Sequence, residues 1–214
     1  MNNAQTKKVL TIFGTRPEAI KMAPLVWALK HDSRISCKIA VTAQHREMLD
    51  QVLDLFHLIP DYDLDIMQAG QTPFDITSRA LFGLRDVLQQ ERFDLILVHG
   101  DTSTTFAGAL ASYYLQIPVA HVEAGLRTYN LNRPFPEEGL RQMIGRIARL
   151  HFAPTARSRQ ALLSEGVPQQ RIWVTGNTVI DAQQWVCAHR GIGRRVNGRG
   201  HLLVTMHRRE NWGQ

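Results

Sequence analysis

The chain has 214 residues, 44% of them hydrophobic, which is enough to bury a substantial core without disulfide or metal staples. Its net charge of +6 does not indicate a nucleic-acid surface, because four arginines gather within the Gly/Arg-rich run at 190–200, which has no aromatic side chains for base stacking. The two cysteines, Cys37 and Cys187, are far apart and lack CxxC spacing, which argues against a disulfide framework or a structural zinc site.

The amino-terminal residues do not have the pattern of a targeting segment. MNNAQTKK is polar, and the apolar run at 9–13 is too short for a signal peptide or a membrane span. We therefore expect a cytoplasmic protein with neither a membrane nor a nucleic acid as partner.

Strand and helix patterns alternate along the whole chain. Short apolar runs rich in β-branched residues predict strands at 9–13, 35–42, 64–67, 94–98, 118–122, 150–153, 172–175 and 201–205. Apolar residues at helical spacing predict helices at 17–29, 44–56, 72–90, 102–115, 155–163 and 177–189, and one that opens at Pro136. This alternation predicts an α/β fold with a doubly wound, Rossmann-like parallel sheet.

The composition also predicts where domains end. We expect a first Rossmann-like domain at 8–190, a Gly/Arg-rich connector at 191–200, and at 201–214 the start of a second Rossmann-like domain that is cut short.

Polar residues follow several predicted strands directly, and the carboxyl ends of parallel strands share one edge of a sheet. Such residues stand at Arg16, at 44–46, at Asp101, at Glu123 and at His207. In an open α/β sheet this edge holds the ligand crevice, so these side chains can converge. Glu137, at the start of a predicted helix, is the third carboxylate of this region.

Simpler explanations exist for each carboxylate. Asp101 precedes a predicted helix and could be its cap. Glu137 stands four residues before Arg141, a spacing that gives a surface ion pair, and the same account is open for Glu138. If Glu137 lies in the crevice, we expect it to be the base and Glu123, among apolar neighbours, to hold its proton more tightly as the acid.

Two histidines stand two residues before the carboxylates. His99 and His121 could be buried, hydrogen-bonded core residues, or could form a divalent-metal set with Asp101 and Glu123. A metal-dependent hydrolase is therefore an alternative function.

A series of motifs extends along the chain from Lys8 in the order FGTRPEAIKMAPLV, VTAQHREMLDQVL, PDYDLDIM, VHGDTSTT, HVEAGLRT, PFPEE, HFAPT, RIWVTGNTVIDA and VTMHRRENWG. In these motifs the sequence closely resembles the non-hydrolysing UDP-N-acetylglucosamine 2-epimerases of bacteria.

The resemblance implies a two-domain GT-B-like fold. It also implies interconversion of UDP-N-acetylglucosamine (UDP-GlcNAc) and UDP-N-acetylmannosamine (UDP-ManNAc) for surface polysaccharides, by anti elimination and re-addition of UDP. It further implies a homodimer for the full-length protein and no metal or nicotinamide cofactor. By matching positions, it implies catalytic roles for four residues and substrate-binding roles for three: Asp101, Glu123, Glu137 and His207; Arg16, Lys21 and Arg208.

Three features depart from the family pattern. Leu140 stands where Asn is usual after the paired glutamates, and Arg146 and Arg149 make their segment more basic than usual. The sequence stops at Gln214, before most of the second domain that holds UDP in this family. We therefore expect little or no epimerase activity from the chain as given, and a sugar-nucleotide-binding fragment is the second alternative.

Overall fold

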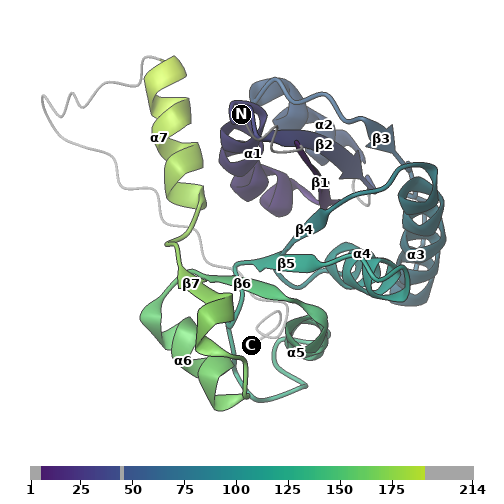
Figure 1. The fold of residues 1–214 in the computed structure, drawn as a ribbon. Helices are drawn as coiled ribbons and strands as arrows, with labels where there is room; N and C mark the ends of the chain where they lie inside the picture. The colour runs from purple at the N-terminus through teal and green to yellow at the C-terminus, as the bar shows by residue number, and fades with distance from the viewer. Residues whose placement is uncertain (1–5, 44–45, 191–214) are drawn as a thin grey trace, which may run out of the picture. The chain divides into compact units, whose positions relative to one another are not determined.

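The computed structural model describes residues 6–43 and 46–190, in which strands and helices alternate (Figure 1). The strands are β1 (Lys7–Phe13), β2 (Ile35–Val41), β3 (Tyr62–Asp63), β4 (Leu95–His99), β5 (Val119–Val122), β6 (Leu150–Ala153) and β7 (Ile172–Val174). The helices are α1 (Arg16–Lys30), α2 (Arg46–Leu55), α3 (Pro73–Gln90), α4 (Ser103–Tyr114), α5 (Glu137–Ile147), α6 (Ala156–Ser164) and α7 (Val179–His189), with a 3₁₀ turn at Gln169–Arg171.

The strands form a seven-stranded sheet in the order β3-β2-β1-β4-β5-β6-β7, and every pairing in it is parallel. This arrangement confirms the predicted doubly wound α/β fold. The strand order reverses between β1 and β4, and in such sheets ligands bind at the carboxyl edge beside this switch point. The turns after β1, β4, β5 and β6 therefore all open on the same edge.

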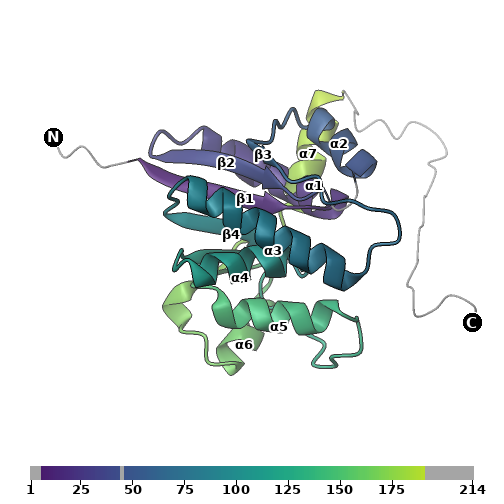
Figure 2. The same cartoon turned by 90° about the vertical axis from the view of Figure 1, so that its right-hand side faces the viewer.

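Helices cover both faces of the sheet. Helices α3, α4 and α5 form a row on one face, whereas α1 and α2 lie on the other (Figure 2). The core between the sheet and the α3–α4 side is built from the fully buried Leu10 and Ile12 of β1, Ile96 and Val98 of β4, and Leu84 of α3. Continuous apolar strands of this kind are buried on both faces, which explains why no alternation of polar residues marks them in the sequence.

The third strand is shorter than predicted and lies earlier in the chain. We predicted it at 64–67, but only Tyr62 and Asp63 pair with β2. Asp65 has φ +44°, in the left-handed region, which ends the extended conformation. Ile66 is nevertheless buried, so its apolar side chain fills the core from a loop.

The chain divides into two compact units, one up to Ala182 and one from Gln183 onwards. The predicted connector at 191–200, the predicted strand at 201–205 and the start of a second domain all lie outside the described residues. So do the candidate residues His207 and Arg208. In the described part of the chain, no helix is both long and apolar enough to cross a membrane.

Candidate active site

Asp101 lies in the turn between β4 and α4, at the carboxyl edge of the sheet. The cap of α4 is Thr102, whose hydroxyl accepts a hydrogen bond from the Thr105 amide at 3.1 Å. Capping therefore does not account for Asp101, and that alternative is wrong. The Asp101 carboxylate instead forms an ion pair with the guanidinium of Arg141 on α5.

Glu123 follows β5 directly and adopts φ +62°, a conformation that is uncommon outside glycine and that clusters at functional sites. Its Oε1 atom accepts hydrogen bonds from Lys21 Nζ at 2.6 Å and from Asn177 Nδ2 at 2.7 Å. On its other side, Oε2 lies 3.7 Å from His99 Nε2. The end of β4, the turns after β5 and β7, and helix α1 thus meet at one carboxylate.

Glu137 and Glu138 begin α5 but have different surroundings. Glu138 is fully buried, and its two oxygens accept hydrogen bonds from the Thr128 and Tyr129 amides, both at 3.0 Å. Arg141 pairs with Glu138 and Asp101, and within the described residues it has no ion pair with Glu137. The predicted Glu137–Arg141 pair is therefore absent, and Glu138 braces the loop after β5 from the interior.

The carboxylates have opposite pKa shifts. Burial raises the pKa of Asp101 and the charges of Glu137 and Glu123 raise it further, although Arg141 opposes them. Burial also raises the pKa of Glu123, but the attraction of His99 and the hydrogen bond and charge of Lys21 outweigh it, so that this pKa lies below its ordinary value. Because burial lowers the pKa of His99 to about 4, Lys21 supplies the positive charge near neutral pH. The expectation that Glu123 would hold its proton more tightly is thus wrong, because its pKa is lowered, whereas the pKa of Asp101 is raised.

Two of the histidines near the carboxylates are core residues. His121 Nε2 lies 2.7 Å from the Gly100 carbonyl oxygen, and both His99 and His121 are almost completely buried. Across residues 6–43 and 46–190, no three His, Cys, Asp or Glu side chains converge as a metal-binding group. The geometry of this part of the chain does not support the metal-dependent hydrolase alternative.

Glu18 is a buried carboxylate that sequence reasoning missed. Its Oε2 accepts from the Gly14 and Thr15 amides at 3.1 and 2.8 Å, and its Oε1 accepts from the Thr102 and Thr105 hydroxyls at 2.8 and 2.9 Å. It therefore fastens the turn after β1 to the turn that carries Asp101. The spacing of Thr15 and Glu18 is that of a capping box, which is the signal that could have indicated it.

The remaining predicted substrate residues of the described chain lie at the same edge. Arg16 is exposed in the first turn of α1, and Lys21, one and a half turns further on, contacts Glu123. The structure therefore brings Lys21, Glu123, Asp101 and Glu137 into one electrostatic neighbourhood. Arg16 makes no ion pair with a described residue.

The fold is one half of a GT-B-like architecture. The structure of MurG from Acinetobacter baumannii is similar with a TM-score of 0.55 at 18% identity, and the match covers 79% of this chain and 45% of that one. The sequence profile described as UDP-N-acetylglucosamine 2-epimerase matches residues 27–214, and the chain belongs to this family.

Individual relatives agree with this assignment. The chain is 57% identical to a probable UDP-N-acetylglucosamine 2-epimerase of Ralstonia nicotianae over 97% of its own length and 58% of the relative's. It is 54% identical to the UDP-GlcNAc 2-epimerase of Neisseria meningitidis, crystallised bound to UDP-GlcNAc, with a TM-score of 0.84 and coverage of 86% of this chain and 50% of that one. The chain thus spans little more than half the length of the relatives it matches.

Proposed function

We propose that this chain supplies the catalytic carboxylates for the interconversion of UDP-GlcNAc and UDP-ManNAc, which feeds surface polysaccharide synthesis. Two observations support the proposal: membership of the epimerase family, and the convergence of Asp101, Glu123 and Glu137 at the switch-point edge, where the pKa of Asp101 is raised and that of Glu123 is lowered. The second observation carries the chemistry, because epimerisation at C2 needs one group to remove a proton and another to return one.

In the first step a base removes the C2 proton. The electron pair of the C2–H bond forms the C1–C2 double bond, and the bond from C1 to the UDP oxygen breaks, so that UDP departs with that electron pair. We assign the base to Glu123, which is ionised and held by Lys21 and Asn177.

In the second step the proton arrives on the opposite face of C2 while the UDP oxygen bonds again to C1. We assign the returning proton to Asp101, whose pKa is raised, with Glu137 as its neighbour. Asp101 takes this proton from water and Glu123 releases the C2 proton to water, which restores both groups. Arg16 and Lys21 are the proposed substrate-binding residues of the described part, because cations stabilise the departing diphosphate. His207 as a catalytic residue and Arg208 as a substrate contact complete the proposed site, and we propose a homodimer for the full-length protein.

A second candidate function is binding of the sugar nucleotide without catalysis. It is favoured for a polypeptide of these 214 residues tested by itself, because they span 58% of the Ralstonia relative's length and so carry only the aligned part of the site. For the 214-residue chain by itself we expect little or no UDP-ManNAc formation.

Calorimetry with UDP-GlcNAc, run beside an assay for exchange of the C2 hydrogen with deuterated water, separates these functions. We expect saturable binding, and any exchange should vanish in Glu123→Gln and persist in the control Glu47→Gln, which alters an exposed carboxylate of α2. Binding without exchange assigns the chain the binding function. A chain that neither binds UDP-GlcNAc nor exchanges the C2 hydrogen contradicts both proposals.

A further inference from the structure

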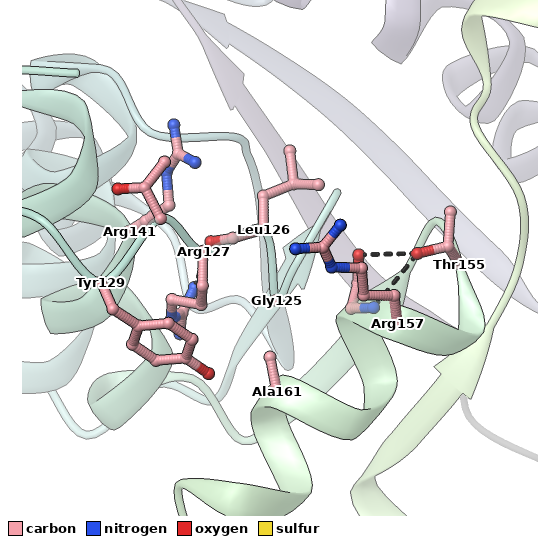
Figure 3. Close-up of a pocket in the computed structure, with 10 residues that line it drawn as sticks. Gly125, Leu126, Arg127, Tyr129, Arg141, Thr155, Arg157 and Ala161 are labelled. Atoms are coloured by element: carbon pink, nitrogen blue, oxygen red, sulfur yellow. Dashed lines mark hydrogen bonds between the residues drawn. The ribbon is translucent and has the colours of Figure 1, made fainter. Parts of the chain in front are cut away.

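A pocket of about 490 Å³ opens between the loop that follows β5 and the first turn of α6 (Figure 3). Its lining includes Gly125, Arg127, Tyr129, Arg141 and Arg157. We propose that this pocket is an anion-binding subsite that takes a phosphate or diphosphate group. The inference does not depend on the reaction proposed above, since it concerns binding alone.

Two of the arginines that line the pocket, Arg127 and Arg141, form ion pairs with carboxylates and make up a fixed wall. Arg127 is almost completely buried, and its Nε and Nη2 atoms donate to the two oxygens of Glu165 at 2.7 and 2.9 Å. Arg141 is held by Asp101 and Glu138. These fixed side chains give the pocket a shape that exists before a ligand arrives.

A buried donor of this wall lacks an acceptor. Among the described residues, the Nε–H group of Arg141 has no hydrogen-bond partner, although the atom is hidden from solvent. Buried guanidinium donors without acceptors are rare, because the lost hydration is not repaid. This unsatisfied donor belongs to a residue that lines the pocket.

Arg157 brings a positive charge that no described residue balances. Within the described part of the chain it has no ion pair, and Figure 3 shows its side chain extending from α6 towards Gly125 and Leu126. Because its guanidinium is a planar fork of donors, it suits the oxygens of a phosphate group better than a single point charge does.

The first turn of α6 adds further donors on the same side. Thr155 Oγ1 accepts from the Ser158 amide at 3.1 Å, whereas the amides of Ala156 and Arg157 have no acceptor among the described residues. Such free amides give the start of a helix a partial positive charge.

The opposite wall is set close against this turn. Gly125 has φ +86°, and a Cβ atom built on it would lie 2.3 Å from the Ser158 carbonyl oxygen, so only glycine allows the approach. The arginine fork of Arg157, the free amides and the neighbouring hydroxyls together select a compact dianion over a neutral sugar.

The proposal is tested by titrating the 15N-labelled 214-residue chain separately with pyrophosphate, UDP and uridine. We expect saturable binding of pyrophosphate and UDP, with shifts of the Gly125 and Ala156 amides, and no such shifts with uridine. Arg157→Gln should weaken both ligands by about tenfold, the usual effect of losing a charged hydrogen bond. The matched control is Arg149→Gln, which removes the same charge from an exposed position before β6, at the end of that strand remote from α6.

Three results would overturn the proposal. They are absence of saturable binding of pyrophosphate and UDP, equal weakening by the two variants, and equal binding of uridine. Because Arg157 is exposed, its substitution should leave the circular dichroism spectrum of the chain unchanged, so loss of binding can be read separately from loss of fold.

Discussion

Part of the acid destabilisation of this fold should trace to a histidine that is buried uncharged. His121 is 1% exposed in β5, and burial lowers its pKa to about 3, against 6.5 for a free histidine. The unfolded chain therefore binds a proton here at pH values where the folded chain does not. The contribution of His121 to stability is complete above pH 6.5 and is lost as the pH falls from there towards the folded-state pKa.

The expected size of this effect follows from the two pKa values. Between pH 7.5 and pH 5.0, protonation of the unfolded state at this one position lowers the free energy of unfolding by about 2 kcal/mol. This change in the free energy of unfolding hardly depends on the pKa of His121 in the folded state, as long as that pKa stays well below 5. In His121→Gln, whose amide nitrogen replaces Nε2 and can still donate to the Gly100 carbonyl, that part of the pH dependence should disappear.

Urea unfolding followed by far-ultraviolet circular dichroism at the two pH values measures the difference. The control is Ser112→Ala, which removes a buried hydrogen bond from the Ser112 hydroxyl to the Gly108 carbonyl without removing a titrating group. It should lower stability by about 1 kcal/mol equally at both pH values. If His121→Gln loses as much stability on acidification as the unchanged chain does, this buried histidine does not contribute to the acid destabilisation.

Three further predictions follow from the contacts of the site. Glu18→Ala removes the acceptor of several buried hydrogen bonds and should lower the free energy of unfolding by more than about 2 kcal/mol in urea titrations. A loss below about 0.5 kcal/mol, which is what an exposed surface substitution costs, would show that Glu18 does not fasten the turn after β1 to the turn that carries Asp101. Gly14→Ala places a Cβ atom 2.0 Å from the Thr42 hydroxyl oxygen and should destabilise the fold. Gly139→Ala adds a Cβ atom in open space within α5 and should stabilise the fold by about 0.5–1 kcal/mol. Equal changes in melting temperature for the two variants would contradict this prediction. Lys21→Met removes a hydrogen bond and a positive charge from Glu123 and should raise the pKa of that carboxyl, which carbon-13 NMR of the side chain can follow, and an unchanged titration would show that Lys21 does not set it.

Most of the elements were predictable because their signals are local. The helix at 72–90 has an apolar face at regular spacing and begins after a threonine cap, and α3 extends over Pro73–Gln90. The strand at 94–98 is an unbroken apolar run, and β4 occupies Leu95–His99. The strand at 64–67 was misplaced because two residues of pairing, ended by one left-handed backbone angle, leave no pattern that a sequence can display.

For the candidate site, the sequence positions of the carboxylates predicted where they lie in the fold, but not which side chains form ion pairs with one another. Carboxylates after strands predicted that Asp101 and Glu123 would share an edge, and electrostatic coupling between them is present in the structure. The sequence could not predict that Arg141 forms its ion pair with Asp101 rather than with Glu137. Asp101 is 40 residues away in sequence and reaches Arg141 only when β4 and α5 are packed.

The sequence by itself therefore determined the fold class, the edge at which chemistry is possible and the family to which the chain belongs, because hydrophobic periodicity and motif order are properties of the linear chain. Tertiary structure alone decided that the pKa of Asp101 is raised and that of Glu123 is lowered, since a pKa depends on burial and on neighbours brought from other elements. It also decided that Glu18 is a buried clamp and that Arg157 faces a pocket with no counter-ion in the described chain. Those are facts about distances between side chains, and such distances exist only after the strands have paired.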